Sequence, residues 1–136
     1  KINSVLELVK IQFNDLSTIL RGLFLIKDTS PKIIDTIVSY GESVSSIIVA
    51  NTIEDAVHFE SKNFIKTIHQ FDKHVVDFPT TNALIKERFV KKNKVSVCGG
   101  FISSDSTTNY ITNLGRGGSD YTAAILAAAL NALLTV

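Results

Sequence analysis

Apolar residues recur at intervals of three and four in the first part of the chain, which is the spacing of an amphipathic helix. The residues with this spacing are Ile2, Val5, Leu6, Val9, Phe13, Leu16, Ile19 and Leu20. We expect Gly22 to end this helix in a left-handed conformation. A second helix is predicted to begin at Ser30 and Pro31 and to run toward Ile53, because serine can cap free N–H groups and proline suits the first helical position.

A glycine interrupts the second predicted helix, at Gly41 between Tyr40 and Glu42. A glycine inside a helix costs about 1 kcal/mol relative to alanine. We therefore expect another group to approach closely at Gly41, or the helix to bend there. Either outcome would make this position part of a site.

The rest of the chain alternates between short extended segments and helices. The pattern predicts strands over 57–64 and 94–98, a helix over 80–92, a strand–turn–strand unit with its turn at 103–109 and its return arm at 110–112, and a last helix that follows 114–120 and reaches Leu130. The residues around Val136 are a candidate start of a further strand. Strands that alternate with helices favour a layered α/β sheet, in one domain spanning residues 1–136.

Composition and charge exclude several classes of protein. The 136 residues are 45% hydrophobic and 20% charged, which is typical of a folded globular domain. The net charge is +1 without a basic stripe, so nucleic acid is not an expected partner. The apolar run 121–136 is interrupted by Asn131 and is shorter than the ~20 residues of a membrane span, so we expect a buried helix and no membrane. A single cysteine, Cys98, cannot form an internal disulfide, which favours the cytoplasm.

The strongest local signal for chemistry is a glycine-rich turn that leads into the last predicted helix through Ser119 and Asp120. Glycines allow positive φ and close approach of a ligand, and the free N–H groups of a helix start favour an anion. Arg116, between Gly115 and Gly117, adds a planar fork that suits a carboxylate or phosphate. Alternatively, Ser119 is an ordinary N-cap, Asp120 complements the helix dipole, and the glycines form a tight turn.

Glu42 is a second candidate binding residue, because its carboxylate could accept hydrogen bonds from a ligand ammonium. The alternative is that Glu42 belongs to a solvated polar face with its neighbours Ser39, Ser43 and Ser45. An arginine for a carboxylate and a glutamate for an ammonium would together form an amino-acid pocket.

Other reactive residue types give weaker signals. The three histidines, His58, His69 and His74, lack the paired spacing of metal ligands, and no second cysteine supports zinc, so we expect no metal site. Cys98 follows a predicted strand and is interpreted as a small buried apolar residue rather than a nucleophile. The chain has no Walker-type phosphate loop.

Two stretches of the sequence resemble the aspartate kinases of the amino acid kinase superfamily. They are SYGESVS over 39–45, and GFI over 100–102 followed by LGRGGSDYTAA over 114–124. The similarity extends over most of the chain, with 20–23, Asp35, 64–67 and 76–77 falling between in the expected order. The resemblance implies an incomplete three-layer α/β/α sandwich of the amino acid kinase type.

The resemblance also implies a reaction, in which the γ-phosphoryl group of ATP is transferred, with Mg²⁺, to the side-chain carboxylate of L-aspartate. This reaction opens lysine, threonine and methionine biosynthesis. By motif match, Arg116 would bind the substrate α-carboxylate and Glu42 its α-ammonium, with Phe101 and Ser119 lining the same pocket. Gly117 and Gly118 would lie on the cofactor side. Asp120 would have the catalytic role of orienting a phosphate-side lysine.

The sequence around the matched stretches differs from that of the aspartate kinases. We expect a partial catalytic domain that lacks the N-terminal glycine loop with its lysine, the C-terminal ATP-binding segments and the regulatory ACT domains. Such a chain would be inactive by itself and active in a full-length parent. A fused aspartokinase–homoserine dehydrogenase is one such parent. We also expect a homo-oligomer. The alternative is a non-catalytic module that binds a small acidic metabolite or mediates oligomerisation.

Overall fold

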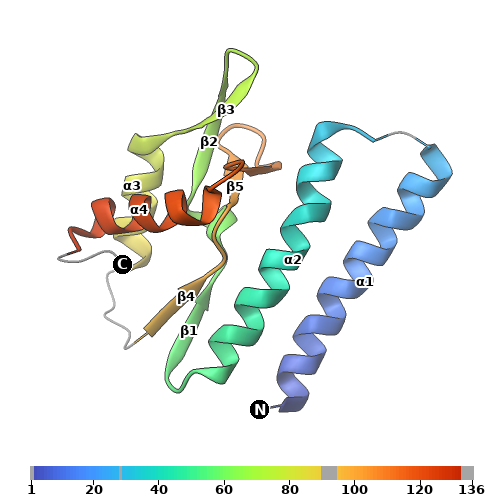
Figure 1. Ribbon diagram of the computed structural model, residues 1–136, viewed down its shortest axis with the longest axis horizontal. Coiled ribbons are helices and arrows are strands. Elements are labelled where there is room, and N and C mark those ends of the chain that lie inside the picture. The colour runs from blue at the N-terminus through green and yellow to red at the C-terminus, as the bar shows by residue number, and fades with distance from the viewer. Residues whose placement is uncertain (1, 28, 90–94, 133–136) are drawn as a thin grey trace.

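The computed structural model describes residues 2–27, 29–89 and 95–132. The chain begins with two long helices, α1 (Ile2–Ile26) and α2 (Pro31–Thr52), which lie side by side as a hairpin (Figure 1). The elements that follow α2 are β1 (Ala56–Phe59), a 3-10 turn η1 (Ser61–Asn63), β2 (Lys66–Gln70), β3 (Lys73–Val76), α3 (Phe78–Arg88), β4 (Val95–Cys98), β5 (Ile102–Asp105), β6 (Ile111–Asn113) and α4 (Gly118–Leu130).

The strands form two sheets. β1 pairs in parallel with β4, with Ala56 opposite Val95. The other four strands have the order β3-β2-β5-β6, in which β2 and β5 are parallel and the two outer pairs are antiparallel. The chain therefore passes from one sheet to the other at the turn between β4 and β5.

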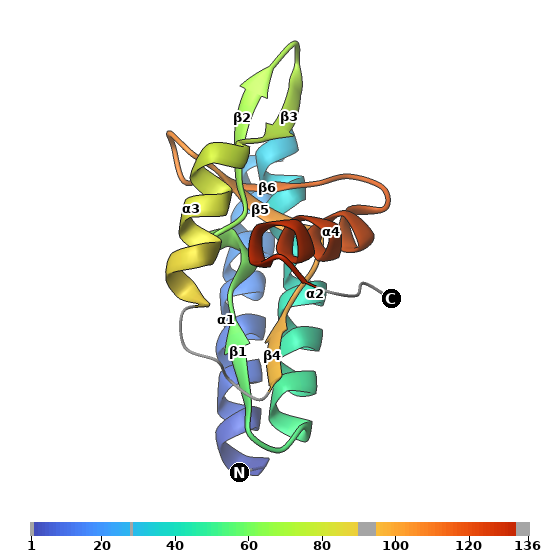
Figure 2. The ribbon, with the colours of Figure 1, turned by 90° about the vertical axis from the view of Figure 1, so that its left-hand side faces the viewer.

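Helices cover the strands on both sides, as Figures 1 and 2 show. α3 and α4 lie against one side, while α2 contacts β1, β4 and β6 from the other side and carries α1 beside it. The layered α/β architecture predicted from the sequence is confirmed.

The hydrophobic core lies where the strands meet α3 and α4. Its buried members are Phe64, Ile65, Ile85, Ile125 and Ala129. The rings of Phe59 and Phe64 both contact Phe89, with centroids 4.6 and 5.5 Å away. The side of α2 that faces the strands is different, because its buried residues include three serines.

By length and composition, α2 is the one helix in the described part of the chain that could cross a membrane. Its surroundings indicate a different role. Ser39, Ser43 and Ser46 are buried against the strands, and the carboxylates of Asp35 and Glu42 are half-buried on the same helix. Polar and ionisable groups are costly inside a bilayer, so we interpret α2 as a packed helix of the protein.

Several predicted elements are present with shifted bounds. The second helix begins at Pro31 after the N-cap Ser30, as expected, although the serine side chain makes no capping hydrogen bond. The third helix begins earlier than predicted, because Asp77 caps it through the Thr80 N–H, 3.2 Å away. Its predicted end at Lys92 and the candidate strand at Val136 lie outside the described residues.

Two predictions about local structure were wrong. Gly22 does not end α1, which continues to Ile26 and stops where Lys27 takes a left-handed φ of 56°. The extended segment predicted over 57–64 is strand only to Phe59. At Gly41, no group of the described chain lies within 4 Å of a Cβ built there, so the expected close approach is not found within the chain, while α2 continues through the glycine.

Candidate functional site

The turn between β4 and β5, formed by Gly99, Gly100 and Phe101, is the centre of the candidate site. Phe101 has a left-handed φ of 66°, which is uncommon for a residue with a side chain and costs conformational energy. Its backbone is held on both sides: the Phe101 N–H donates to Thr122 Oγ1 at 3.0 Å, and its carbonyl accepts from the Leu114 N–H at 2.9 Å. The surrounding structure therefore fixes a strained residue at this position.

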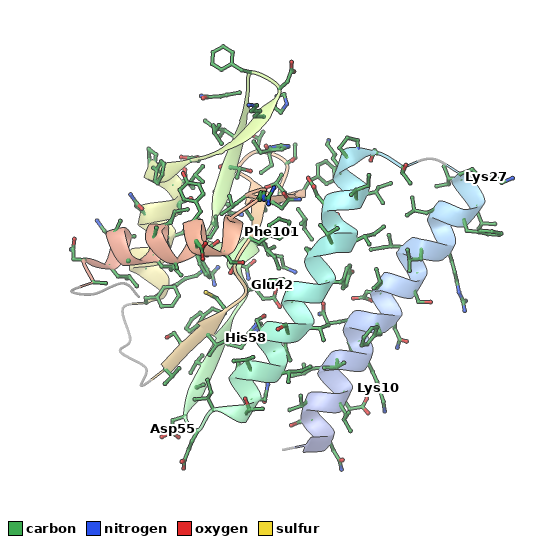
Figure 3. The ribbon with its side chains drawn as sticks, in the orientation of Figure 1. Lys10, Lys27, Glu42, Asp55, His58 and Phe101 are labelled. Carbon is green, nitrogen blue, oxygen red and sulfur yellow. The ribbon has the colours of Figure 1, made fainter. Side chains whose placement is uncertain are left out.

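Glu42 reaches this turn from α2. Its Oε1 accepts a hydrogen bond from the Gly100 N–H at 3.1 Å. A Cβ on Gly99 would lie 3.1 Å from Glu42 Cγ, so the glycine also makes room for the glutamate stem. Figure 3 shows Glu42 and Phe101 near each other, between α2 and the start of α4. Glu42 is therefore part of a fixed contact between elements, and not of a solvated face.

The start of α4 packs on the other side of the turn. A Cβ on Gly100 would lie 2.7 Å from Ser119 Cα, and one on Gly118 would lie 3.0 Å from the Phe101 ring. Neither position has room for a side chain. Ser119 thus lies directly against the turn, although it remains exposed.

The glycine-rich loop that leads into α4 needs glycine for its backbone at two places. Gly115 and Gly117 have φ of 73° and 76°, and Gly117 is the N-cap of α4. Gly117 has no side chain that could cap the first helical turn, and of the N–H groups in that turn the Gly118 N–H donates to the Gly115 carbonyl at 3.0 Å. Binding of an anion at the N–H groups that follow Gly118 stays a prediction.

Arg116 and Asp120 are exposed. Within the described part of the chain, the Arg116 guanidinium makes no hydrogen bond or ion pair. The structure thus brings Glu42, Phe101 and Ser119 together at the turn. It leaves Arg116, on the adjoining loop, with its donors unused.

Two residues that hold the turn were not singled out from the sequence. Ser61 Oγ donates to the Gly99 carbonyl, and Thr122 accepts from the Phe101 N–H while donating to the Gly118 carbonyl at 2.8 Å. Small hydroxyl residues are frequent in any chain; Ser61 lies outside the two quoted stretches, and Thr122 lies within 114–124 but was given no role there. The signal that identifies them is their contact with a strained backbone.

The cysteine and the three histidines make contacts within the described chain. Burial raises the pKa of the Cys98 thiol, which lies at the edge of the core. His58 Nε2 lies 2.9 Å from Ser46 Oγ (Figure 3), and the rings of His69 and His74 contact each other at 5.4 Å. The described residues contain no group of three or more His, Cys, Asp or Glu placed to hold a metal ion.

Comparisons with known proteins give one consistent result. The family model described as "Amino acid kinase family" matches residues 5–136. The lysine-sensitive aspartokinase 3 of Escherichia coli is 33% identical over 110 residues, which are 76% of this chain and 24% of that protein. The bifunctional aspartokinase/homoserine dehydrogenase of Buchnera aphidicola is 28% identical over 93% of this chain and 16% of its own length.

A solved structure gives the same result for the fold. The crystal structure of E. coli aspartokinase III in complex with aspartate and ADP superposes with a TM-score of 0.80 and 29% identity, over 97% of this chain and 30% of that chain. The chain therefore spans less than a third of the relatives it matches.

Proposed function

Because this chain belongs to the amino acid kinase family, we propose that it forms the aspartate-binding part of an aspartokinase catalytic domain. The observation that carries the proposal is the contact between Glu42 and Gly100, which holds a carboxylate at the turn against which the start of α4 packs. The longer relatives are aspartokinases, and one of them has been solved with aspartate and ADP. We place the protein in the cytoplasm, where a free thiol such as Cys98 stays reduced.

In this proposal the α-carboxylate and the α-ammonium of L-aspartate are each bound by a charged side chain of the protein. The Arg116 guanidinium has a planar fork of donors without partners in the described chain, so it is available to bind the α-carboxylate in a bidentate manner. Glu42 uses Oε1 for Gly100, and its second oxygen is assigned to the α-ammonium. Phe101 and Ser119, which lie against the same turn, line the pocket.

The phosphate side of the site is assigned to the start of α4. ATP, when bound, supplies the γ-phosphoryl group. The uncapped N–H groups that follow Gly117 and Gly118 suit a phosphate oxygen. Asp120 is exposed in the first turn of the helix, and its proposed role is to position a lysine on the phosphate side. Mg²⁺ is assigned no ligand, because the described residues offer no cluster of acidic groups for it.

The proposed chemistry needs positioning more than proton transfer. The side-chain carboxylate of aspartate is already ionised at neutral pH, so its attack requires no general base. What the chain provides is an aspartate held by its α-carboxylate and α-ammonium groups, and a helix start that favours negative charge. Because the chain spans about a quarter of the aspartokinases it matches, we expect it to bind aspartate without phosphorylating it.

Calorimetric titration of the chain with L-aspartate, and separately with Mg-ATP, tests the proposal. We expect saturable aspartate binding that is lost in Arg116→Ala, with no binding of Mg-ATP. Arg21→Ala is the matched control, because Arg21 is also exposed but lies on α1. Aspartate binding that survives Arg116→Ala, or no aspartate binding by the intact chain, would contradict a preformed aspartate site.

A further inference from the structure

A second pocket lies between the first turn of α2 and the four-stranded sheet β3-β2-β5-β6. Its volume is about 650 Å³. The side chains that line it and can bind a ligand by charge or hydrogen bonds include Lys32 of α2 and, from the sheet and its loop, His69, His74, Asp105 and Tyr110. None of these residues has a role in the proposed aspartate site.

The register of the sheet brings the pocket residues of the strands together. His69 of β2 and His74 of β3 are directly opposite each other. Asp105 of β5 is opposite Thr67, which precedes His69 by two residues and is therefore on the same face of the sheet. The Asp105 N–H donates to the Tyr110 carbonyl at 2.9 Å, which places Tyr110 beside it. The floor of the pocket is thus fixed by strand pairing.

The nitrogen groups around the pocket lack acceptors within the described chain. His74 Nδ1 is buried there without a hydrogen-bond partner. No hydrogen bond or ion pair is found in the described residues for Lys32 or His69: the Lys32 ammonium lies 4.4 Å from the centre of the Tyr110 ring, and the His69 ring contacts that of His74. A buried polar atom without a partner is costly, so this arrangement indicates a ligand that supplies acceptors.

The acidic side chains at the pocket already have donors of their own. Asp105 Oδ1 accepts from the N–H groups of Thr107 and Thr108, at 3.0 and 2.7 Å, and from the Thr108 hydroxyl at 2.9 Å. Asp35, about one turn after Lys32 on α2, accepts a hydrogen bond from the Asn113 side chain. The pocket therefore has nitrogen donors in excess and no carboxylate assigned to them.

We propose that this pocket binds a phosphate monoester, with the phosphate group held by Lys32, His69 and His74. A phosphate monoester has three terminal oxygens, which match three nitrogen donors, and it carries the negative charge that the Lys32 ammonium attracts. Small-molecule sites have volumes of roughly 300–1,000 Å³, so the pocket also has room for the organic part of the ester. Pro31 and the Tyr110 ring line it with apolar surface for that part.

The same residues argue against other occupants. A metal ion is not favoured, because the described residues contain no group of three or more His, Cys, Asp or Glu placed to hold one, and the Lys32 ammonium repels cations. A carboxylate has two oxygens and would leave one of the three donors unpaired. The start of α2 adds to the preference for an anion, because the Ser30 side chain makes no capping hydrogen bond there.

The phosphate pocket is separate from the turn at Gly100. Lys32 lies ten residues before Glu42 on α2, which is about 15 Å along the helix axis at ~1.5 Å per residue. The residues assigned to aspartate do not line the pocket. Binding of a phosphate monoester here therefore does not depend on aspartate binding, and each can be tested without the other.

Titration of the chain with phenyl phosphate, followed by NMR of the imidazole C–H signals at constant pH and ionic strength, tests the pocket. The chain has three histidines, so single substitutions assign every signal. We expect saturable shifts for His69 and His74. His58 is the internal control, because its Nε2 lies 2.9 Å from Ser46 Oγ on another part of α2, and its signals should stay in place.

Two substitutions test the donors assigned to the phosphate. Lys32→Ala and His74→Phe should each weaken the binding of phenyl phosphate at least about tenfold, because each removes one of three donors. Lys86→Ala is the matched control: Lys86 is an exposed lysine on α3, and its loss should leave the dissociation constant unchanged. Far-UV circular dichroism and thermal unfolding show whether each variant is folded, and Lys32 is exposed, so its replacement keeps the core intact.

Two further probes test the chemical class of the ligand. Benzoate has the same ring with a carboxylate and should bind at least about tenfold more weakly than phenyl phosphate. Inorganic phosphate should shift the same two histidines and depend on Lys32 in the same way. The absence of a saturable shift with phenyl phosphate, an equal shift of His58, or binding that survives Lys32→Ala would overturn the site, and equal affinity for benzoate would overturn its preference for phosphate.

Discussion

Gly100 and Ser119 are in such close contact that a Cβ on the glycine would lie 2.7 Å from the Cα of the serine. This contact joins the turn after β4 to the first helical turn of α4. It places two segments that are separated by the whole β5–β6 hairpin next to each other, and Glu42 of α2 is bonded to the same glycine. The candidate site depends on this one point of close packing.

We predict that Gly100→Ala destabilises the protein by about 1–3 kcal/mol, as expected for overpacking. The atom that the new methyl group meets belongs to the helix backbone, which cannot rotate away. Urea denaturation followed by circular dichroism measures the change. Gly22→Ala is the control, because nothing lies near its Cβ position, and we expect it to stabilise the protein by up to about 1 kcal/mol.

Glu42 has two roles that a pair of substitutions separates. Glu42→Gln keeps an oxygen acceptor for the Gly100 N–H but removes the charge, so the free energy of unfolding should change by less than about 0.5 kcal/mol. Glu42→Ala leaves that N–H without its partner and should cost about 1–3 kcal/mol. Denaturation curves of the two variants provide the comparison.

Glu42→Gln should also reduce the discrimination between aspartate and succinate, which has the same two carboxylates but no ammonium. We expect the preference for aspartate to fall at least about tenfold, while Arg116→Ala should weaken both ligands alike. Competition calorimetry gives both affinities. Glu87→Gln, at an exposed position of α3, is the control. An unchanged preference in Glu42→Gln would exclude a contact with the ammonium.

Thr122→Val tests how the strained Phe101 is held. Valine has the shape of threonine but cannot accept a hydrogen bond from the Phe101 N–H. We therefore expect a loss of about 1–3 kcal/mol in the free energy of unfolding. Thr36→Val is a close control, since the Thr36 hydroxyl makes the same type of bond to the carbonyl four residues earlier and no further bond to another element is found for it in the described chain. Equal effects of the two substitutions would show that the bond to Phe101 contributes nothing.

Stability in acid should depend on Asp77, the N-cap of α3. Its hydrogen bonds to Thr80, and then to Ser106, lower the pKa of the Asp77 carboxyl in the folded protein. A carboxylate with a lowered folded pKa contributes stability that is complete above its unfolded pKa of about 4, and this contribution is lost as the pH falls through the folded pKa. Asp77→Asn should therefore make the free energy of unfolding less dependent on pH below about 4. Urea titrations at a series of pH values measure this, and an unchanged slope would contradict it.

The sequence predicted the helices best, because their signals are local. The apolar spacing and the Ser30 and Pro31 start located α2, and the glycine-rich loop located the start of α4. The β2–β3 hairpin was missed for a local reason as well. Its turn is formed by Phe71 and Asp72, both with positive φ, and contains no glycine or asparagine to indicate it.

The candidate site was predicted only in part. Glu42, Phe101 and Ser119 were identified by their motifs, and the structure brings them to one turn. The close approach expected at Gly41 is not found within the described chain, because a glycine in a helix shows that a side chain is absent but not which group uses the space. The roles of Ser61 and Thr122 were not predicted, since they come from hydrogen bonds to residues 38 and 21 positions away.

The sequence by itself determined what is encoded by neighbours along the chain: the periodicity of the helices, the glycines that allow positive φ at 115 and 117, and the family to which the motifs belong. Tertiary structure alone decided which segments meet. The close contact at Gly100 and the partner of Glu42 both depend on how helices and strands separated in sequence pack together. Packing is a property of shape in three dimensions, and the pattern along a single chain does not contain it.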